Sequence, residues 1–206
     1  MRLAHISQRN AFHEPVWHVV AAILIVIGLQ LILNDVLTFG FKYVIVGLEV
    51  LLLLILSIFS LPAAGRRVVA ISLVALISAV NIVSLAVVIG LLFTSNHVEG
   101  HQLLISSVAI YITNIIMFGL WYWELDNTKK ASSDFQFPHP PASEGGDRWQ
   151  PTFFDYLYVS VTNATAFSPT DTMPLTHRAK LLMTVQSIAS LVTVALVAAR
   201  AVNILS

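Results

Sequence analysis

Five runs of apolar residues, each about as long as a bilayer is thick, constrain what this chain can fold into. A helix needs about 20 apolar residues to cross the hydrocarbon core of a membrane. Leucine, isoleucine and valine dominate each run, and charged side chains are rare inside them. The pattern predicts an all-α, multi-pass membrane protein with five transmembrane helices. The runs are residues 16–37, 41–61, 68–94, 102–123 and 181–205.

The overall composition agrees with this class and argues against several others. Of the 206 residues, 57% are hydrophobic and 11% are charged, whereas about 25% of the residues in an ordinary soluble domain are charged. The 11 basic residues balance the 11 acidic ones, so no net charge favours nucleic acid as a partner. The absence of cysteine excludes disulfides, thiolate metal sites and cysteine nucleophiles. Because no catalytic, metal-binding or phosphate-binding motif is visible, we expect neither an enzyme nor a bound cofactor or metal.

The connectors between the runs predict three parts. Residues 1–15 form a polar N-terminal tail, and residues 16–95 form a three-helix N-terminal transmembrane region. The third part, residues 101–206, contains the last two runs and everything between them. It divides into a helix at 102–123, a long loop at 124–151, an interrupted segment at 152–176 and a last helix at 177–205.

The interrupted segment is too short and too broken to cross a bilayer. Residues 155–174 read DYLYVSVTNATAFSPTDTMP, in which an aromatic-rich stretch is followed by Pro169. Proline removes a backbone donor and favours extended geometry in the residue before it, so a helix must end near this point. Irregular backbone at membrane depth is tolerated only inside protein or beside a water-filled cavity. We therefore expect a short re-entrant helix whose chain turns and returns to the same side of the membrane.

This segment resembles, without a gap, the pore segment of tetrameric potassium-channel-like proteins. In that family an acidic residue and an aromatic-rich pore helix precede Thr-Thr-Val-Gly-Tyr-Gly-Asp, and a proline follows three residues later. The resemblance covers about residues 102–205 and implies an outer helix, a pore helix and an inner helix. It also implies a homo-oligomer, a tetramer in that family, because a closed pore needs several pore helices. The matching positions are Asp155, Leu157, Tyr158, Ser160, Thr165, Ala166, Phe167, Ser168, Pro169, Thr170, Asp171 and Pro174.

The selectivity filter that this resemblance implies is degenerate. The two filter glycines of the family fall on Ser168 and Thr170, and its tyrosine falls on Pro169. Glycine permits backbone angles that residues with a Cβ adopt only at a cost, so rings of inward carbonyls are not expected here. Thr165 still begins the filter and Asp171 still ends it. We expect a pore lined by hydroxyl groups, with a ring of Asp171 carboxylates, that passes monovalent cations with weak selectivity.

Two other functions remain open at this point. The first is a non-conducting structural or regulatory membrane protein that kept the pore fold after losing the filter glycines. The second is a small proton-coupled transporter that uses Glu49, which lies about eight residues into the second run. A carboxylate at that depth costs a few kcal/mol unless it is paired. Glu49 is therefore a candidate functional residue, and the alternative is a structural partner for a polar side chain on a neighbouring helix.

Polar side chains in the last run form a further candidate. Gln186, Ser190 and Thr193 are three or four residues apart and so share one face of a helix. Two roles fit this stripe: it lines the pore, or it bonds to neighbouring helices. Asn114 in the fourth run is expected to make an interhelical hydrogen bond worth about 0.6–2 kcal/mol. Arg200 either extends its charge to the membrane interface or places it at the pore mouth.

The distribution of lysine and arginine predicts an orientation in the plasma or inner membrane. With the N-terminus in the cytoplasm, five spans place nine basic residues on the inner side and two on the outer side. The positive-inside rule therefore favours a cytoplasmic N-terminus. This conflicts with the resemblance, because the filter mouth of the family faces outward. The nine are Arg2, Arg9, Arg66, Arg67, Lys129, Lys130, Arg148, Arg178 and Lys180, and the two are Lys42 and Arg200.

Overall fold

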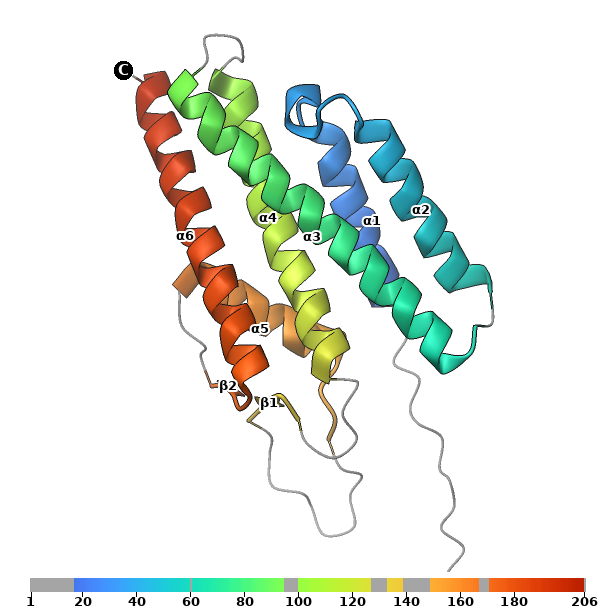
Figure 1. Cartoon of the computed structure of the whole chain (residues 1–206). Helices are drawn as coiled ribbons and strands as arrows, with labels where there is room; N and C mark the ends of the chain where they lie inside the picture. Colours follow the sequence, from blue (N-terminus) through green and yellow to red (C-terminus); the bar gives the residue numbers. More distant parts are fainter. Residues whose placement is uncertain are drawn as a thin grey trace, which may run out of the picture.

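The computed structural model shows long helices packed side by side, with one short helix lying across one end of the bundle (Figure 1). The structure describes residues 17–59, 61–94, 100–126, 133–138, 149–166 and 171–205. Their elements, in chain order, are α1 (Trp17–Ile32), the 3-10 helix η1 (Asp35–Thr38), α2 (Lys42–Ile58), α3 (Ala63–Thr94), α4 (Gly100–Asp126), β1 (Phe135–Gln136), α5 (Phe153–Ala166), β2 (Met173–Pro174) and α6 (His177–Leu205).

The long helices run alternately up and down, which gives the bundle two ends. We call the end where α2 and α4 finish and α5 and α6 begin the α5 end (Figure 1). We call the opposite end, where η1 joins α1 to α2, the η1 end. The described basic residues of the α3 and α6 N-termini, Arg66, Arg67, Arg178 and Lys180, belong to the α5 end.

In the part of the chain that the structure describes, three helices are long and apolar enough to cross a membrane. These are α3, α4 and α6. The first two runs form shorter helices, because α1 has 16 residues and α2 has 17, against the roughly 20 that a span needs. The structure is thus compatible with a membrane protein, and it supports three of the five predicted spans.

The chain leaves α1 earlier than the apolar run predicts because the residues after it prefer a turn. The side chain of Asn34 accepts a hydrogen bond from the backbone N–H of Val36 and starts the separate η1 helix. Phe39 and Gly40 then adopt left-handed backbone angles, with φ of 51° and 77°. Gly40 does so without steric cost, and the chain reverses into α2.

The third helix begins earlier than the apolar run predicts, because residues 63–67, which lie between the second and third runs, belong to α3. The sequence begins the third helix at residue 68, whereas α3 already begins at Ala63. Pro62 directly precedes this first turn, and its carbonyl accepts a hydrogen bond from the N–H of Arg66. Similarly, the first three residues of the predicted loop at 124–151 belong to a helix, because α4 continues to Asp126.

α4 is the central helix of the bundle. It packs against α1, α3, α5 and α6. In its most apolar stretch 67% is buried, compared with 22% in the corresponding stretch of α6. Gly119 allows α5 to approach closely, since a Cβ atom at this position would lie 3.2 Å from the Cα of Leu157. The large exposed part of α6 leaves one face of that helix without a partner among the described residues.

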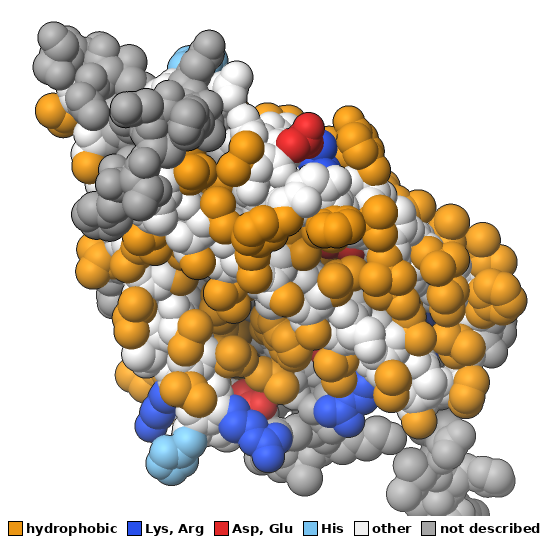
Figure 2. Space-filling view, turned by 45° about the horizontal axis from the view of Figure 1, so that its top comes forward, with side chains coloured by type: hydrophobic (Ala, Val, Ile, Leu, Met, Phe, Trp, Pro, Cys, Tyr) orange, Lys and Arg blue, Asp and Glu red, His pale blue; other side chains and the backbone are white. Residues whose placement is uncertain are grey.

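The molecular surface is predominantly apolar. Figure 2 shows hydrophobic side chains spread over the visible face, with most of the visible lysine and arginine side chains along its lower edge and one more beside an acidic side chain near the top. A broad apolar surface bounded by charge suits a protein whose sides contact lipid tails. The orientation of the chain in a membrane stays a prediction.

Candidate functional site: the junction of α4, α5 and α6

The N-terminus of α5 lies beside the C-terminus of α4. The backbone N–H and the hydroxyl of Thr152 both donate to the Asp155 carboxylate, at 2.7 and 2.8 Å, which caps the first turn. The Tyr156 hydroxyl donates to the carboxylate of Asp126, the last residue of α4, at 2.6 Å. Asp155, which the resemblance places at the start of a pore helix, thus stabilises the start of α5.

The other end of α5 lies beside the middle of α4. The Tyr111 hydroxyl donates to the backbone carbonyl of Ala164 at 3.2 Å, and the Ser160 hydroxyl donates to the carbonyl of Ile115 at 2.6 Å. Tyr111 is 15 residues before Asp126, which corresponds to about 22 Å of helix. α5 has 14 residues, so this short helix starts at the α5 end of the bundle and finishes next to the central part of α4.

A buried hydrogen-bond network joins α5 to α4 and α6 and is centred on Gln186. The Gln186 amide donates to the Ser160 carbonyl at 3.0 Å and to its hydroxyl at 2.7 Å. Its oxygen accepts from Tyr122 Oη at 2.5 Å and from Asn163 Nδ2 at 2.9 Å. Gln186, Tyr122 and Ser160 are fully buried, and Asn163 is 2% exposed. Because all the donor and acceptor capacity of the Gln186 amide is used, this polar group is accommodated in an apolar interior.

The rest of the polar stripe on α6 also faces neighbouring helices. Ser190 accepts a hydrogen bond from Asn114 of α4 at 3.0 Å, and Thr193 donates to the carbonyl of Ala189 in its own helix at 2.7 Å. Both stripe residues are buried. Within a single chain, therefore, the stripe has the packing role that the sequence left open, while pore lining by these side chains stays a prediction. The Asn114 bond is the interhelical contact that the sequence predicts.

The predicted filter residues are only partly described. Thr165 is exposed, and its hydroxyl donates to the carbonyl of Val161 at 2.8 Å. Ala166 ends α5, and Asp171 is exposed where the described chain resumes. The residues between them, Phe167, Ser168, Pro169 and Thr170, lie outside the described residues.

After this gap the chain returns to the α5 end and is fixed there. β2 pairs antiparallel with β1, with Phe135 opposite Pro174. The backbone carbonyl of Asp134 accepts a hydrogen bond from the Leu175 N–H at 2.8 Å, and its carboxylate accepts one from the Thr176 hydroxyl. Thr176 also caps the first turn of α6 through the N–H of Ala179. The start of α6 is thereby tied to the segment that follows α4.

Several residues of this junction are not singled out by the sequence. Asn163 and Ser160, one turn apart on an amphipathic short helix, carry a recognisable signal, because they form its polar face. Tyr122 lies in an aromatic cluster and gives no indication of its partner. Asp126 and Asp134 both lie in the first part of the predicted long loop, and only the folded chain shows that both are buried.

Glu49 lies far from this junction along the chain and is fully buried in α2. The Gln30 amide of α1 donates to its Oε1 at 2.9 Å. The sequence points to Glu49 but not to this partner, since a single amide in an apolar run does not reveal where it bonds. The side chain of Arg200 lies outside the described residues.

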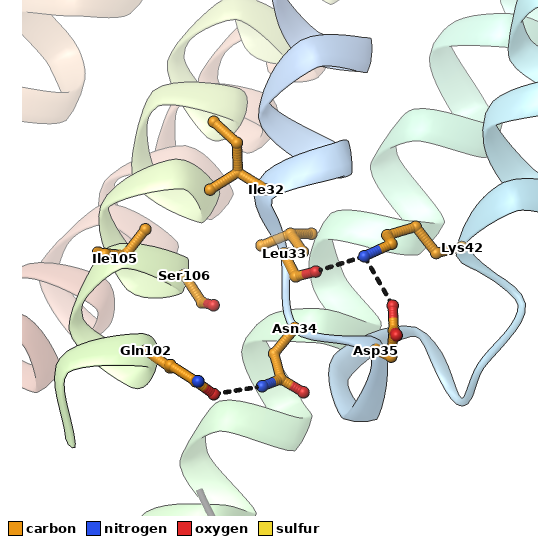
Figure 3. Close-up of a pocket in the computed structure, with 8 residues that line it drawn as sticks. All are labelled: Ile32, Leu33, Asn34, Asp35, Lys42, Gln102, Ile105 and Ser106. Atoms are coloured by element: carbon orange, nitrogen blue, oxygen red, sulfur yellow. Dashed lines mark hydrogen bonds and ion pairs between the residues drawn. The ribbon is translucent and has the colours of Figure 1, made fainter. Parts of the chain in front are cut away.

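A cavity of about 350 Å³ opens at the η1 end (Figure 3). Lys42 points into it and contacts the carboxylate of Asp35 at 2.6 Å and the carbonyl of Leu33 at 3.1 Å. Asn34 and Gln102, which also line the cavity, are joined by a hydrogen bond from Asn34 Nδ2 to Gln102 Oε1 at 2.7 Å. The cavity contains none of the residues that the sequence predicts as functional. Its lining is Ile32, Leu33, Asn34, Asp35, Lys42, Gln102, Ile105 and Ser106.

No family model, curated protein or solved structure matches this chain.

Proposed function

We propose that this protein assembles as a homo-oligomer, a tetramer by the resemblance, into a weakly selective cation pore, with α4 as outer helix, α5 as pore helix and α6 as inner helix. The observation that carries the proposal is the course of α5. This helix starts at one end of the bundle and finishes beside the middle of α4, and the chain then returns to the same end. A half-helix of this kind matches the resemblance of its sequence to a channel pore segment.

The electrostatics at the end of α5 favour a cation. The C-terminus of a helix carries a partial negative charge of about half an elementary charge. Thr165 and Ala166, the last two residues of α5, are both exposed, so none of the described residues covers this end. Several chains around an axis would bring several such ends together, with the exposed Asp171 carboxylates nearby.

The face of α6 that none of the described residues covers supplies the surface for assembly. Its exposed apolar side chains recur every three or four residues and so form one stripe, away from the buried Gln186 and Ser190. In the proposed oligomer this stripe contacts neighbouring copies and the axis. The stripe contains Leu181, Val185, Ile188 and Leu191.

A non-conducting relative of channels is the second candidate, and the same stripe favours it. Apolar constrictions close pores by excluding water, and the polar side chains of α6 are used inside the chain. In this alternative the oligomer forms and no ion passes.

Flux of potassium and sodium into liposomes containing the purified protein separates these functions. We expect cation flux that falls in Thr165→Val and Asp171→Asn. The matched control is Ser57→Ala, because the Ser57 hydroxyl bonds to the carbonyl four residues earlier, as the Thr165 hydroxyl does, but lies in α2. Unchanged flux in both variants would contradict the pore assignment.

The oligomeric state gives the second measurement. Native mass spectrometry in detergent should show a multimer whose stability falls when Ile188 is replaced by lysine. A multimer without flux identifies the non-conducting alternative. A monomer without flux contradicts both candidates.

A further inference from the structure

Two buried oxygen atoms between α1 and α2 lack a hydrogen-bond donor among the described residues. Gln30 is 3% exposed and Glu49 is fully buried. One bond joins them, from Gln30 Nε2 to Glu49 Oε1, at 2.9 Å. The remaining oxygens, Gln30 Oε1 and Glu49 Oε2, have no hydrogen-bond partner in the part of the chain that the structure describes. Each of the two side chains therefore has one oxygen that can accept a further hydrogen bond.

A single proton on Glu49 satisfies both atoms. Each unsatisfied buried acceptor costs about 1–3 kcal/mol, and a protonated carboxyl group carries an O–H donor as well as an acceptor. The carboxylic acid and the amide then form two reciprocal bonds, Gln30 N–H to Glu49 C=O and Glu49 O–H to Gln30 C=O. The terminal torsions of both side chains are broad, so the groups reach a common plane without backbone movement.

Among the described residues of the surrounding elements, no cation holds Glu49 as a carboxylate. α2 packs against α1 and α3, and Lys42, two turns before Glu49, contacts Asp35 and the carbonyl of Leu33 instead. On α1, α3 and η1 the other groups lie near the helix ends, away from Glu49. The described titratable and charged groups of these elements and α2 are His18, Asp35, Lys42, Tyr43, Arg66 and Arg67, besides Glu49 itself.

The number of available oxygens favours a proton over a metal ion. Hard metal cations take about six or more oxygen ligands, whereas a shared proton needs two. The geometry points to a proton-binding site made by Glu49 and Gln30 within the α1–α2 hairpin. A carboxyl group that holds a proton in an apolar interior is the chemical unit from which proton relays in membranes are built.

Infrared spectroscopy tests this site on the whole protein. At neutral pH we expect a C=O stretching band of a protonated carboxyl group that is lost in Glu49→Gln and retained in Glu124→Gln, a control in α4. In Gln30→Leu the band should move to higher frequency, because the Glu49 O–H loses its acceptor. The Gln30→Leu arm keeps the carboxyl group and so remains informative if Glu49→Gln does not fold.

Three outcomes overturn the proposal. One is a neutral-pH spectrum in which wild type and Glu49→Gln have the same protonated-carboxyl bands. The other is a Glu49 band that appears only near pH 4.3, where an exposed glutamic acid takes up its proton. A band that disappears on adding sodium at constant pH shows that a metal ion competes for the same oxygens and also contradicts a site specific for protons.

Discussion

Replacement of Gln186 by methionine should destabilise the helical bundle far more than loss of an ordinary polar contact. Methionine is unbranched and similar in length, so it fills the space while removing four hydrogen bonds to Ser160, Tyr122 and Asn163. At about 0.6 kcal/mol for each interhelical bond, the loss is about 2.4 kcal/mol. The Tyr122 O–H also becomes an unpaired buried donor, which adds about 1–3 kcal/mol. We expect a total of about 3–5 kcal/mol.

Equilibrium unfolding in a denaturing detergent, followed by circular dichroism, measures this free energy. The control is Thr193→Val, because the Thr193 hydroxyl bonds within its own helix and valine keeps its shape. The rescue is Tyr122→Phe in the Gln186→Met background, which removes the unpaired donor and should recover about 1–3 kcal/mol. If Gln186→Met costs no more than the control, or if Tyr122→Phe gives no recovery, the reasoning about the network is refuted.

Three further results are expected. Gly119→Ala should destabilise the protein by about 1–2 kcal/mol in the same unfolding assay, because the added Cβ meets the α5 backbone. Its control, Gly28→Ala, should stabilise the protein by up to about 1 kcal/mol, because no atom lies within 4 Å of the added Cβ. Equal effects of the two substitutions would contradict this. Tyr156→Phe should lower the free energy of unfolding by about 1.5–3 kcal/mol, because it removes the hydrogen bond to the Asp126 carboxylate. Thermal unfolding measures this loss, and an unchanged unfolding temperature would contradict it. If the folded protein holds a proton on Glu49 that the unfolded chain releases near pH 4.3, unfolding free energy should fall as pH rises above that value. Glu49→Gln should not show this component, and parallel pH profiles would count against it.

The long apolar runs predict the positions of α3, α4 and α6 because hydropathy over 20 residues dominates any local preference. α6 begins at His177, where the sequence places its last helix. The shorter α1 and α2 depend on a local competition instead. Asn34 caps a separate turn, and a side-chain cap of this kind outweighs the apolar character of the next few residues.

The candidate site is less accessible from the sequence than the fold. The polar stripe of Gln186, Ser190 and Thr193 is visible in the residues, but its direction is not. The same stripe on a helix can face a pore or a neighbouring helix. Which of the two it faces depends on its partners Asn163 and Tyr122, which lie 23 and 64 residues from Gln186 in the sequence. Gln30 and Glu49 illustrate the same limit, since their 19-residue separation spans a hairpin whose register no pattern encodes.

The points at which α6 is held determine how it can move. Its first turn is tied to the segment after α4 through Thr176 and Asp134. In its middle, Ser190 accepts a hydrogen bond from Asn114 of α4, and in its far half Leu196 packs against a hydrophobic cluster at the η1 end. A rod held at its start, its middle and its far half cannot tilt about one of these points without breaking the contacts at the others. α6 and α4 should therefore move as one body, so that any change in the width of an assembly built on α6 requires whole chains to rotate against one another.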